Sequence, residues 1–289
     1  MRIPIALCIC LVIFSPLAAE GECEKLAVLD LGMDPAGGPT VAATINDHPE
    51  TMLIDTGGAA SMLTRTVSDQ LALARRPLPP RLALTAHGVA IRESAIVKKL
   101  SFGGLAVSDL HFLVIPDGVV PASDAGTLAL DVFASSDLAF DFALGKLALF
   151  AGGSCSSPPP LPDDAGYSAV PIHRDAFGHI LSSADADGRP IEVLIDTGSS
   201  ITHMNQDDAR TALGWREDAV DSKPDARGND LLVLKSLHLG SLDLGSVPVR
   251  LSSKPGPRQP RLIIGMNTLK MFRLFMAANT QTLYIAPAR

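Results

Sequence analysis

Two acidic side chains in this sequence lie in matching copies of one tripeptide. Asp-Thr-Gly starts at Asp55 and again at Asp196, and each copy follows a short apolar run. The run predicts a buried strand that ends at the carboxylate, and the glycine two residues later lets the chain turn with its N–H groups directed back at that carboxylate. One copy predicts a charged turn, whereas two copies in matching surroundings indicate two carboxylates that act together.

Carboxylates that share one site titrate as a pair. Like charge raises the pKa of one and lowers that of the other, so the pair holds a single proton over a broad pH range. The ionised member can take a proton from a water molecule held between them while the protonated member bonds a substrate carbonyl. Asp55 and Asp196 are therefore candidate catalytic residues for the attack of water on an amide, without a covalent intermediate.

The surroundings of the two aspartates repeat as well. At a constant offset Thr64 falls on Asn205, and both are good helix N-cap residues, so each copy predicts a strand, a tight turn and a helix. Residues 100–107 match residues 237–244 at a slightly shorter offset, and their alternating apolar pattern predicts a hairpin of half-buried strands. These matches indicate an internal duplication.

The duplication predicts the domain organisation. Each copy contains mostly short strands with one or two helices, so the expected fold class is all-β with small helices in two homologous lobes. We expect the N-terminal lobe at residues 24–151, a Pro/Ser-rich linker at 152–166 and the C-terminal lobe at 167–289. The chain of 289 residues, 47% of them hydrophobic, is large enough for two cores.

The first residues predict export. A basic residue, an apolar stretch at 3–14 and a group of small residues are typical of a secretory signal peptide, here residues 1–21, and of a secreted or periplasmic protein. The apolar stretch is shorter than the ~20 residues of a membrane span, so we expect no membrane contact once it is removed. An uncleaved anchor is the alternative, and cleavage after Ala19 or after Gly21 fits the sequence.

The cysteines fit an exported protein. Two of the four fall inside the signal segment, which leaves Cys23 before the first lobe and Cys155 in the linker. In an oxidising compartment we expect them to form a disulfide that clamps the start of the lobe to the linker, with two free thiols as the alternative.

Charge and motif content exclude several classes of protein. The net charge is −7 and the basic residues are scattered, so neither nucleic acid nor an anionic membrane surface is an expected partner. Neither aspartate is followed by the lysine of a phosphoaspartate ATPase, no glycine-rich phosphate loop is present, and no histidine pair has the helix spacing of a zinc protease. Among the histidines, His203 lies close enough to Asp196 in sequence to tune the site.

The paired turns make the chain resemble the pepsin and retropepsin class of aspartic proteases, whose hallmark is two Asp-Thr-Gly turns. The resemblance spans residues 27–150 and 169–285 and implies a bilobal acid-protease fold of two β-barrel-like lobes, as if two retropepsin-like units were fused. It implies an aspartic endopeptidase that hydrolyses extended peptide or protein substrates, favours apolar side chains beside the cleaved bond, and needs no metal or organic cofactor. A fused pair needs no partner to complete its site, so a monomer is expected.

The resemblance also assigns roles around the two turns. It makes Asp55 and Asp196 the catalytic pair, Thr56 and Thr197 a lock between the turns, and Gly57 and Gly198 the points where backbone N–H groups approach the carboxylates. Ser199 has a hydroxyl that could bond the outer oxygen of its carboxylate, whereas Gly58 has none. We therefore expect Asp196 to keep the lower pKa.

Members of this class close a β-hairpin flap over the substrate. Candidate flap tips lie at His87 and Gly88 in the first lobe and at Arg227 and Gly228 in the second, so one or two flaps are expected. Neither tip carries the tyrosine familiar from the pepsin flap.

Two residues depart from the family pattern. An apolar-apolar-Gly segment passes beneath each turn in the family; residues 263–265 fit it, but Ala129 replaces the expected glycine in the first lobe. Together with Gly58, this residue favours a rival hypothesis, a non-catalytic peptide-binding protein with a degenerate cleft. A processing protease with a single native substrate is a further alternative.

Overall fold

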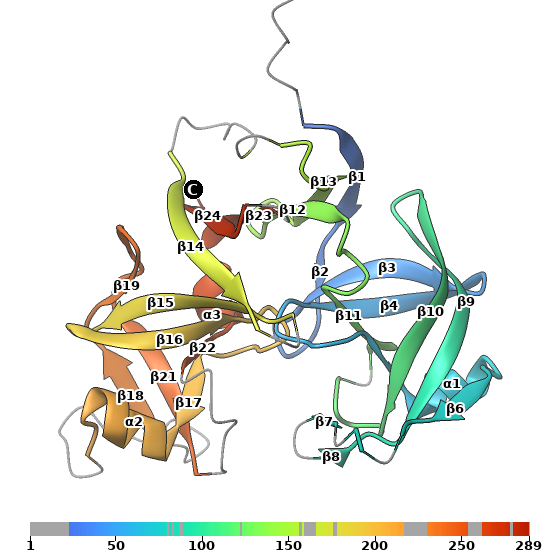
Figure 1. Cartoon of the computed structure of the whole chain (residues 1–289), viewed down its shortest axis with the longest axis horizontal. Helices are drawn as coiled ribbons and strands as arrows, with labels where there is room; N and C mark the ends of the chain where they lie inside the picture. Colours follow the sequence, from blue (N-terminus) through green and yellow to red (C-terminus); the bar gives the residue numbers. More distant parts are fainter. Residues whose placement is uncertain are drawn as a thin grey trace, which may run out of the picture.

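The computed structural model describes residues 23–79, 81–82, 84–86, 89–121, 123–155, 158, 166–175, 178–216, 230–253, 262–277 and 280–288. Within these ranges the chain consists of strands and three short helices. Figure 1 shows two lobes side by side beneath a shared sheet. The predicted fold class, all-β with small helices in two lobes, is confirmed. The predicted signal peptide at 1–21 lies outside the described residues.

Six strands of the N-terminal lobe close into a barrel. In barrel order they are β3 (Pro39–Ile45), β4 (His48–Asp55), β11 (Gly126–Ala129), β5 (Met62–Thr64), β10 (Leu105–Ile115) and β9 (Glu93–Phe102). The barrel closes because β3 pairs with β9 as well as with β4. Four short strands lie outside this ring: β2 (Gly32–Met33), β6 (Arg75–Pro77), β7 (Thr85–Ala86) and β8 (Val89–Ala90).

The C-terminal lobe repeats this order with one interruption. Its strands run β15 (Ile180–Ala186), β16 (Arg189–Ile195), β22 (Leu262–Ile264), β17 (His203–Asn205), β21 (Val247–Ser252) and β18 (Leu231–Leu234). The next strand, β19 (Leu237–Leu239), returns to pair with β15 and forms a hairpin with β20 (Leu242–Asp243). The long strand β9 of the first lobe thus corresponds to β18 and β19 together.

A six-stranded antiparallel sheet joins the lobes. Its order is β1 (Lys25–Asp30), β13 (Lys146–Ala151), β12 (Ser136–Asp141), β23 (Phe272–Ala277), β24 (Thr282–Pro287) and β14 (Ser168–Arg174). Each half of the chain supplies three strands, and the halves meet where β12 pairs with β23. Equivalent strands therefore lie at equal distances from this junction, which is an approximate two-fold relation.

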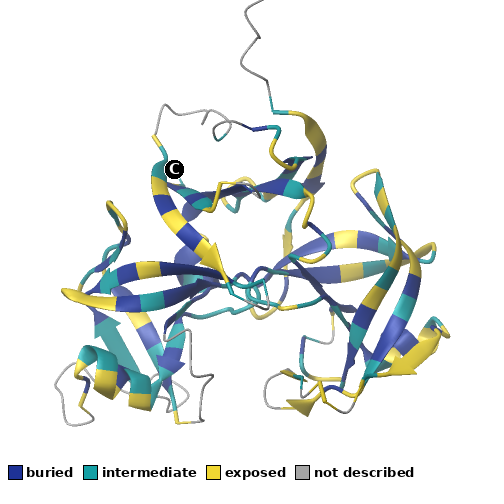
Figure 2. Ribbon diagram, viewed as in Figure 1, coloured by how far each residue is buried: buried dark blue, intermediate teal, exposed yellow. Residues whose placement is uncertain are grey.

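Local sequence explains both lobe helices. The predicted N-caps are observed: the Thr64 side chain accepts from the Val67 N–H (3.3 Å) at α1 (Arg65–Gln70), and Asn205 accepts from the Asp207 N–H (2.7 Å) at α2 (Gln206–Leu213). A third helix, α3 (Met266–Leu269), follows β22. Strand residues alternate between buried and exposed (Figure 2), and the buried apolar residues of both lobes belong to one continuous core. None of the helices in the described ranges is long and apolar enough to cross a bilayer.

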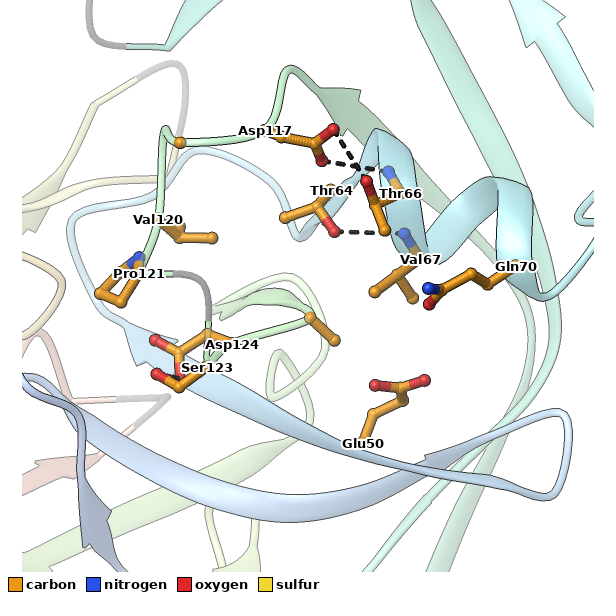
Figure 3. A pocket seen from close by; sticks show the side chains of 12 residues that line it. Glu50, Thr64, Thr66, Val67, Gln70, Asp117, Val120, Pro121, Ser123 and Asp124 are labelled. Carbon is orange, nitrogen blue, oxygen red and sulfur yellow. Dashed lines mark hydrogen bonds between the residues drawn. The ribbon is translucent and has the colours of Figure 1, made fainter.

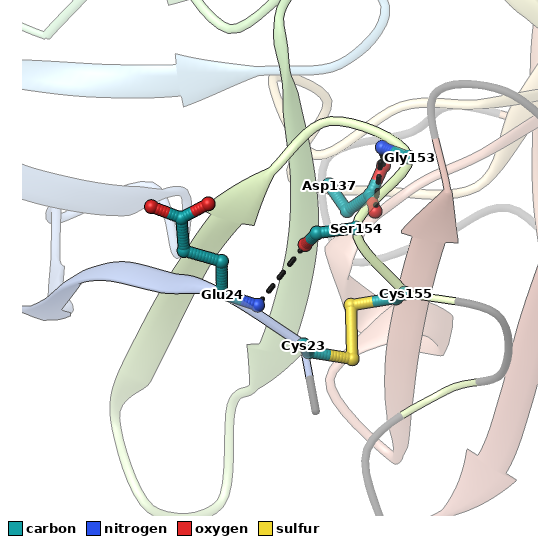
Figure 4. Close-up of a disulfide and its surroundings, with 6 residues drawn as sticks. All are labelled: Cys23, Glu24, Asp137, Gly153, Ser154 and Cys155. Atoms are coloured by element: carbon teal, nitrogen blue, oxygen red, sulfur yellow. Dashed lines mark hydrogen bonds between the residues drawn. A yellow bond between two sulfur atoms is a disulfide. The ribbon is translucent and has the colours of Figure 1, made fainter. Parts of the chain in front are cut away.

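A disulfide between Cys23 and Cys155 ties the start of β1 to the residues that follow β13 (Figure 4). The backbone supports the same junction, since the Glu24 N–H donates to the Ser154 hydroxyl (3.1 Å) and the Gly153 N–H to the buried carboxylate of Asp137 (3.2 Å). The crosslink closes a loop of more than a hundred residues, which restricts the unfolded chain strongly.

Candidate active site

The two Asp-Thr-Gly turns sit at the ends of equivalent buried strands. β4 ends at Asp55, and β16 ends at Ile195, one residue before Asp196. Parallel strands run beside them: Ala129 of β11 pairs with Asp55, and Ile264 of β22 pairs with Ile195. Because the apolar residues of these strands pack into the core, they fix where each carboxylate emerges.

The structure brings the carboxyl groups of Asp55 and Asp196 together. Each one packs against the glycine of the opposite turn: a Cβ atom on Gly57 would lie 2.3 Å from Cγ of Asp196, and a Cβ atom on Gly198 would lie 2.5 Å from Oδ1 of Asp55. When one carboxyl group is protonated, the two share a hydrogen bond. Only glycine leaves room for this approach.

The two threonines lock the turns to each other. The Thr56 N–H donates to Oγ1 of Thr197 (3.1 Å), and the Thr197 N–H donates to Oγ1 of Thr56 (3.0 Å). Each hydroxyl then donates across the junction, from Thr56 to the Ile195 carbonyl (2.8 Å) and from Thr197 to the Ile54 carbonyl (2.7 Å). Both threonines are fully buried, so these four bonds hold the carboxylates in register away from water.

Backbone donors differ between the two aspartates. Oδ1 of Asp196 accepts from the N–H groups of Gly198 (2.8 Å) and Ser199 (3.1 Å), and Oδ1 of Asp55 accepts from that of Gly57 (3.0 Å). One sequence expectation is corrected here: the Ser199 hydroxyl donates to the Ile201 carbonyl (2.8 Å) rather than to the carboxylate. The carbonyl lies two residues along the same loop, and it captures the hydroxyl.

Burial raises the pKa of both carboxyl groups, but not equally. For Asp55, burial and then the negative charge of Asp196 raise the pKa to about 8, against the opposing N–H groups of Gly57 and Gly58. Burial also raises the pKa of Asp196, where the Gly198 N–H and the positive charge of His203 hold it down. The bond between the two carboxyl groups raises the pKa of Asp55 and lowers that of Asp196. This direction agrees with the sequence expectation, but the Ser199 hydroxyl on which that expectation rested bonds Ile201 instead.

A polar clamp beneath each turn was missed by the sequence analysis. In the first lobe the Ser61 hydroxyl donates to Asp131 (2.6 Å) and accepts from the Ala129 N–H (2.9 Å). In the second lobe the Thr202 hydroxyl donates to Asn267 (2.9 Å) and accepts from the Gly265 N–H (3.1 Å). The signal that could have revealed the clamps is that polar residues recur at equivalent positions of the two copies, in the loop after each turn and in the segment beneath it.

The two departures from the family pattern occupy one place. A Cβ atom on Gly58 would lie 2.7 Å from Oδ2 of Asp55 and 3.2 Å from Cβ of Ala129. In the other lobe Ser199 carries a side chain, and a Cβ atom on Gly265 would lie 2.3 Å from the Ile201 carbonyl oxygen. Where the turn crosses the strand beneath it, the first lobe therefore has glycine in the turn and alanine in the strand, and the second lobe has serine in the turn and glycine in the strand. Gly58 and Ala129 thus fit together and leave the site geometry intact.

The predicted flap tips, His87, Gly88, Arg227 and Gly228, lie outside the described residues. On either side of the first tip, β7 and β8 pair as an antiparallel hairpin (Thr85 with Ala90). In Figure 1 this hairpin lies at the bottom of the N-terminal lobe, away from the shared sheet. Among the described residues, no three histidine, cysteine or acidic side chains gather where they could hold a metal ion.

A cavity of about 330 Å³ lies elsewhere in the N-terminal lobe, beside the start of α1 (Figure 3). Its acidic lining residues are Glu50, Asp117 and Asp124. Asp117 accepts from the N–H (3.1 Å) and hydroxyl (2.8 Å) of Thr66, and these bonds lower its pKa. Neither catalytic candidate lines this cavity, so it is separate from the paired turns.

Comparison with known families agrees with the geometry. Residues 41–132 match the family described as aspartyl protease, a span that runs from β3 through Asp55 to the segment beneath its turn. This match supports an aspartyl protease family and a protease function. A comparison with curated proteins finds no match.

Proposed function

We propose that this chain is an aspartic endopeptidase, built as two retropepsin-like units in one polypeptide, which hydrolyses extended peptide or protein substrates with water held between Asp55 and Asp196. The observation that carries the proposal is the close approach of the two carboxyl groups on two mutually locked turns. The family match at residues 41–132 supports the same reaction class.

The reaction follows from the protonation order. Ionised Asp196 takes a proton from the water, whose oxygen attacks the amide carbon, while Asp55 gives its proton to the carbonyl oxygen. The gem-diol then returns a proton to Asp55, and Asp196 gives its own to the amide nitrogen as the C–N bond breaks. Acid, amine and the original protonation state result, with no covalent intermediate.

Other parts of the proposal concern substrate and setting. The paired β7 and β8 strands support a hairpin flap in the first lobe, with His87 and Gly88 at its tip, and by resemblance Arg227 and Gly228 mark a second. We propose a monomer that is secreted or periplasmic. The Cys23–Cys155 disulfide supports an oxidising compartment.

Cleavage of an unfolded protein and of a peptide library from pH 3 to 8 tests the proposal. Wild-type protein should cleave, and Asp55→Asn or Asp196→Asn should each lower kcat/KM by at least ~100-fold, since each removes one half of the acid–base pair. Asp207→Asn is the matched control, because Asp207 is an exposed residue of α2 paired with Arg210. Binding of peptides by wild-type protein without any cleavage would favour the non-catalytic hypothesis instead.

The pH profile provides a second test. Cleavage requires Asp196 ionised and Asp55 protonated, so activity should rise as Asp196 ionises and fall as the pH passes the pKa of Asp55, near 8. Since burial raises both pKa values, the optimum should lie above that of two ordinary aspartates. A profile with a maximum below pH 3 would contradict the assigned protonation states.

A further inference from the structure

His203 lies in the loop that carries Asp196, on the first position of β17. Its Nδ1 atom is 3.3 Å from Oγ of Ser199 and 3.2 Å from the Ile201 carbonyl oxygen. Because a carbonyl only accepts, the ring nitrogen that faces it carries the proton and donates. The imidazole therefore bonds the same loop whose backbone faces the carboxylate.

These contacts connect to Asp196 through one residue. The Ser199 hydroxyl oxygen lies within hydrogen-bond distance of the ring. The N–H of the same residue donates to Oδ1 of Asp196 (3.1 Å). The hydroxyl also donates to the Ile201 carbonyl (2.8 Å). Imidazole, hydroxyl and carbonyl thus form a closed cluster that orients the Ser199 N–H.

The N-terminal lobe has no such cluster. At the positions equivalent to Ser199, Ile201 and His203 it has Gly58, Ala60 and Met62, none of which has a polar side chain that could build one. Met62 begins β5 as His203 begins β17, so the backbone frame is the same. At these positions the lobes differ in the side chains that the loop carries.

We propose that His203 is a positioning residue that, through Ser199 and its own positive charge, makes Asp196 rather than Asp55 the ionised member of the pair. This inference rests on the proposed aspartic protease function. An imidazole is cationic in acidic solution, and its charge lowers the pKa of Asp196. Ionised Asp196 is then available as the base across the acidic range.

Few other charges compete for this ring among the described residues. β21 places Arg250 opposite His203 in the strand register, and β22 offers only Leu262, Ile263 and Ile264. The charged residues of α2 are Asp207, Asp208 and Arg210, and an ion pair joins the first and last of these. Asp196 is the acidic residue of the loop that leads to His203, and the positive charge of the ring lowers its pKa.

The test compares wild-type protein with His203→Gln and His203→Met, the second of which introduces the residue of the other lobe. Both should leave kcat/KM nearly unchanged at the optimum and lower it by about threefold to tenfold on the acid limb, because Asp196 then binds its proton more tightly. His238→Gln is the matched control: it removes a partly exposed histidine of the same lobe, which faces Asp243. Urea unfolding at the optimum identifies any variant that is merely unstable.

A second readout does not require activity. Carbon-13 NMR of the aspartate carboxyl groups, assigned with Asp196→Asn, follows the titration of the pair directly. In His203→Gln the Asp196 signal should titrate at higher pH than in wild-type protein. An unchanged titration would overturn the role of His203, whereas absence of cleavage by wild-type protein with a shifted titration would overturn the proposed function and leave this inference standing.

Discussion

The two lobes share a frame around the active-site candidates but differ in the groups mounted on it. Both turns are locked by the same four threonine bonds, and both are clamped from beneath by a hydroxyl residue. The clamp partner is an ionisable acid, Asp131, in one lobe and a neutral amide, Asn267, in the other. The frame is symmetric because each threonine bond from one turn to the other has a counterpart that runs the opposite way.

The difference has a chemical use. Two identical carboxylates in identical surroundings would compete equally for one proton, and neither would be a dedicated base. The C-terminal lobe adds the positive charge of His203 on the side of Asp196, where it lowers the pKa of that carboxyl group. The symmetric threonine bonds thus position the two carboxyl groups, and the groups found in one lobe alone make their pKa values differ.

The largest effect is expected from the threonine lock. Thr56→Val leaves the Thr197 N–H and the Ile195 carbonyl buried without partners, and Thr197→Val does the same in mirror fashion. Each should lower the free energy of unfolding by about 2–4 kcal/mol, measured by urea denaturation. Thr56→Ser keeps the hydroxyl and should retain most of the stability. Clearly unequal losses for the two valine variants would show that the lock is not symmetric.

A smaller effect should distinguish the segments beneath the turns. Gly265→Ala places a methyl group 2.3 Å from the Ile201 carbonyl oxygen, a backbone atom that can only move with its loop. We expect a loss of about 2–3 kcal/mol in the free energy of unfolding. The reciprocal Ala129→Gly has no overlap to relieve and should cost about 1 kcal/mol through chain entropy. Equal losses would contradict the difference in space between the lobes.

The smallest effect should come from a second pair of acids. The Asp34 carboxylate accepts from the Gly38 N–H (2.8 Å) and faces Asp124, whereas its counterpart Asp175 is bonded by the His179 ring (2.8 Å). Burial, with a smaller contribution from Asp34, raises the pKa of Asp124 to about 6. The folded protein therefore binds this proton more tightly than the unfolded chain does.

The sign of the pH dependence follows from that difference. Ionised Asp124 is a cost above pH 6, and the cost disappears as the pH falls below the ordinary aspartate pKa. Asp124→Asn should raise the free energy of unfolding at pH 7 by about 1–2 kcal/mol. It should also reduce the gain in stability that the wild-type protein shows as the pH falls from 7 to 4. A variant whose stability follows the wild-type pH curve unchanged would contradict the effect. Parallel measurements of unfolding in urea across this range provide the comparison.

Much of the fold could be predicted from the sequence because its signals are local. Apolar runs before Asp55 and Asp196 predicted the buried strands, and the hydroxyl of Thr64 and the amide of Asn205 predicted where the helices begin. The clamps were missed because Ser61 and Asp131 lie far apart in the chain and only the barrel brings them together. The predicted bond from the Ser199 hydroxyl to the carboxylate was wrong for a similar reason, since the path of the loop places the Ile201 carbonyl within reach of that hydroxyl.

The sequence by itself determined the pairing of the acids: two Asp-Thr-Gly turns at the ends of equivalent apolar strands leave few other arrangements for a folded chain. Only the tertiary structure decided which groups set the two pKa values, because the Ser199 hydroxyl expected to do so bonds the Ile201 carbonyl instead. Protonation depends on burial, on the direction of N–H groups and on the distance to His203. Those quantities act through space over a few ångströms, and residue order specifies them only after the lobes have packed.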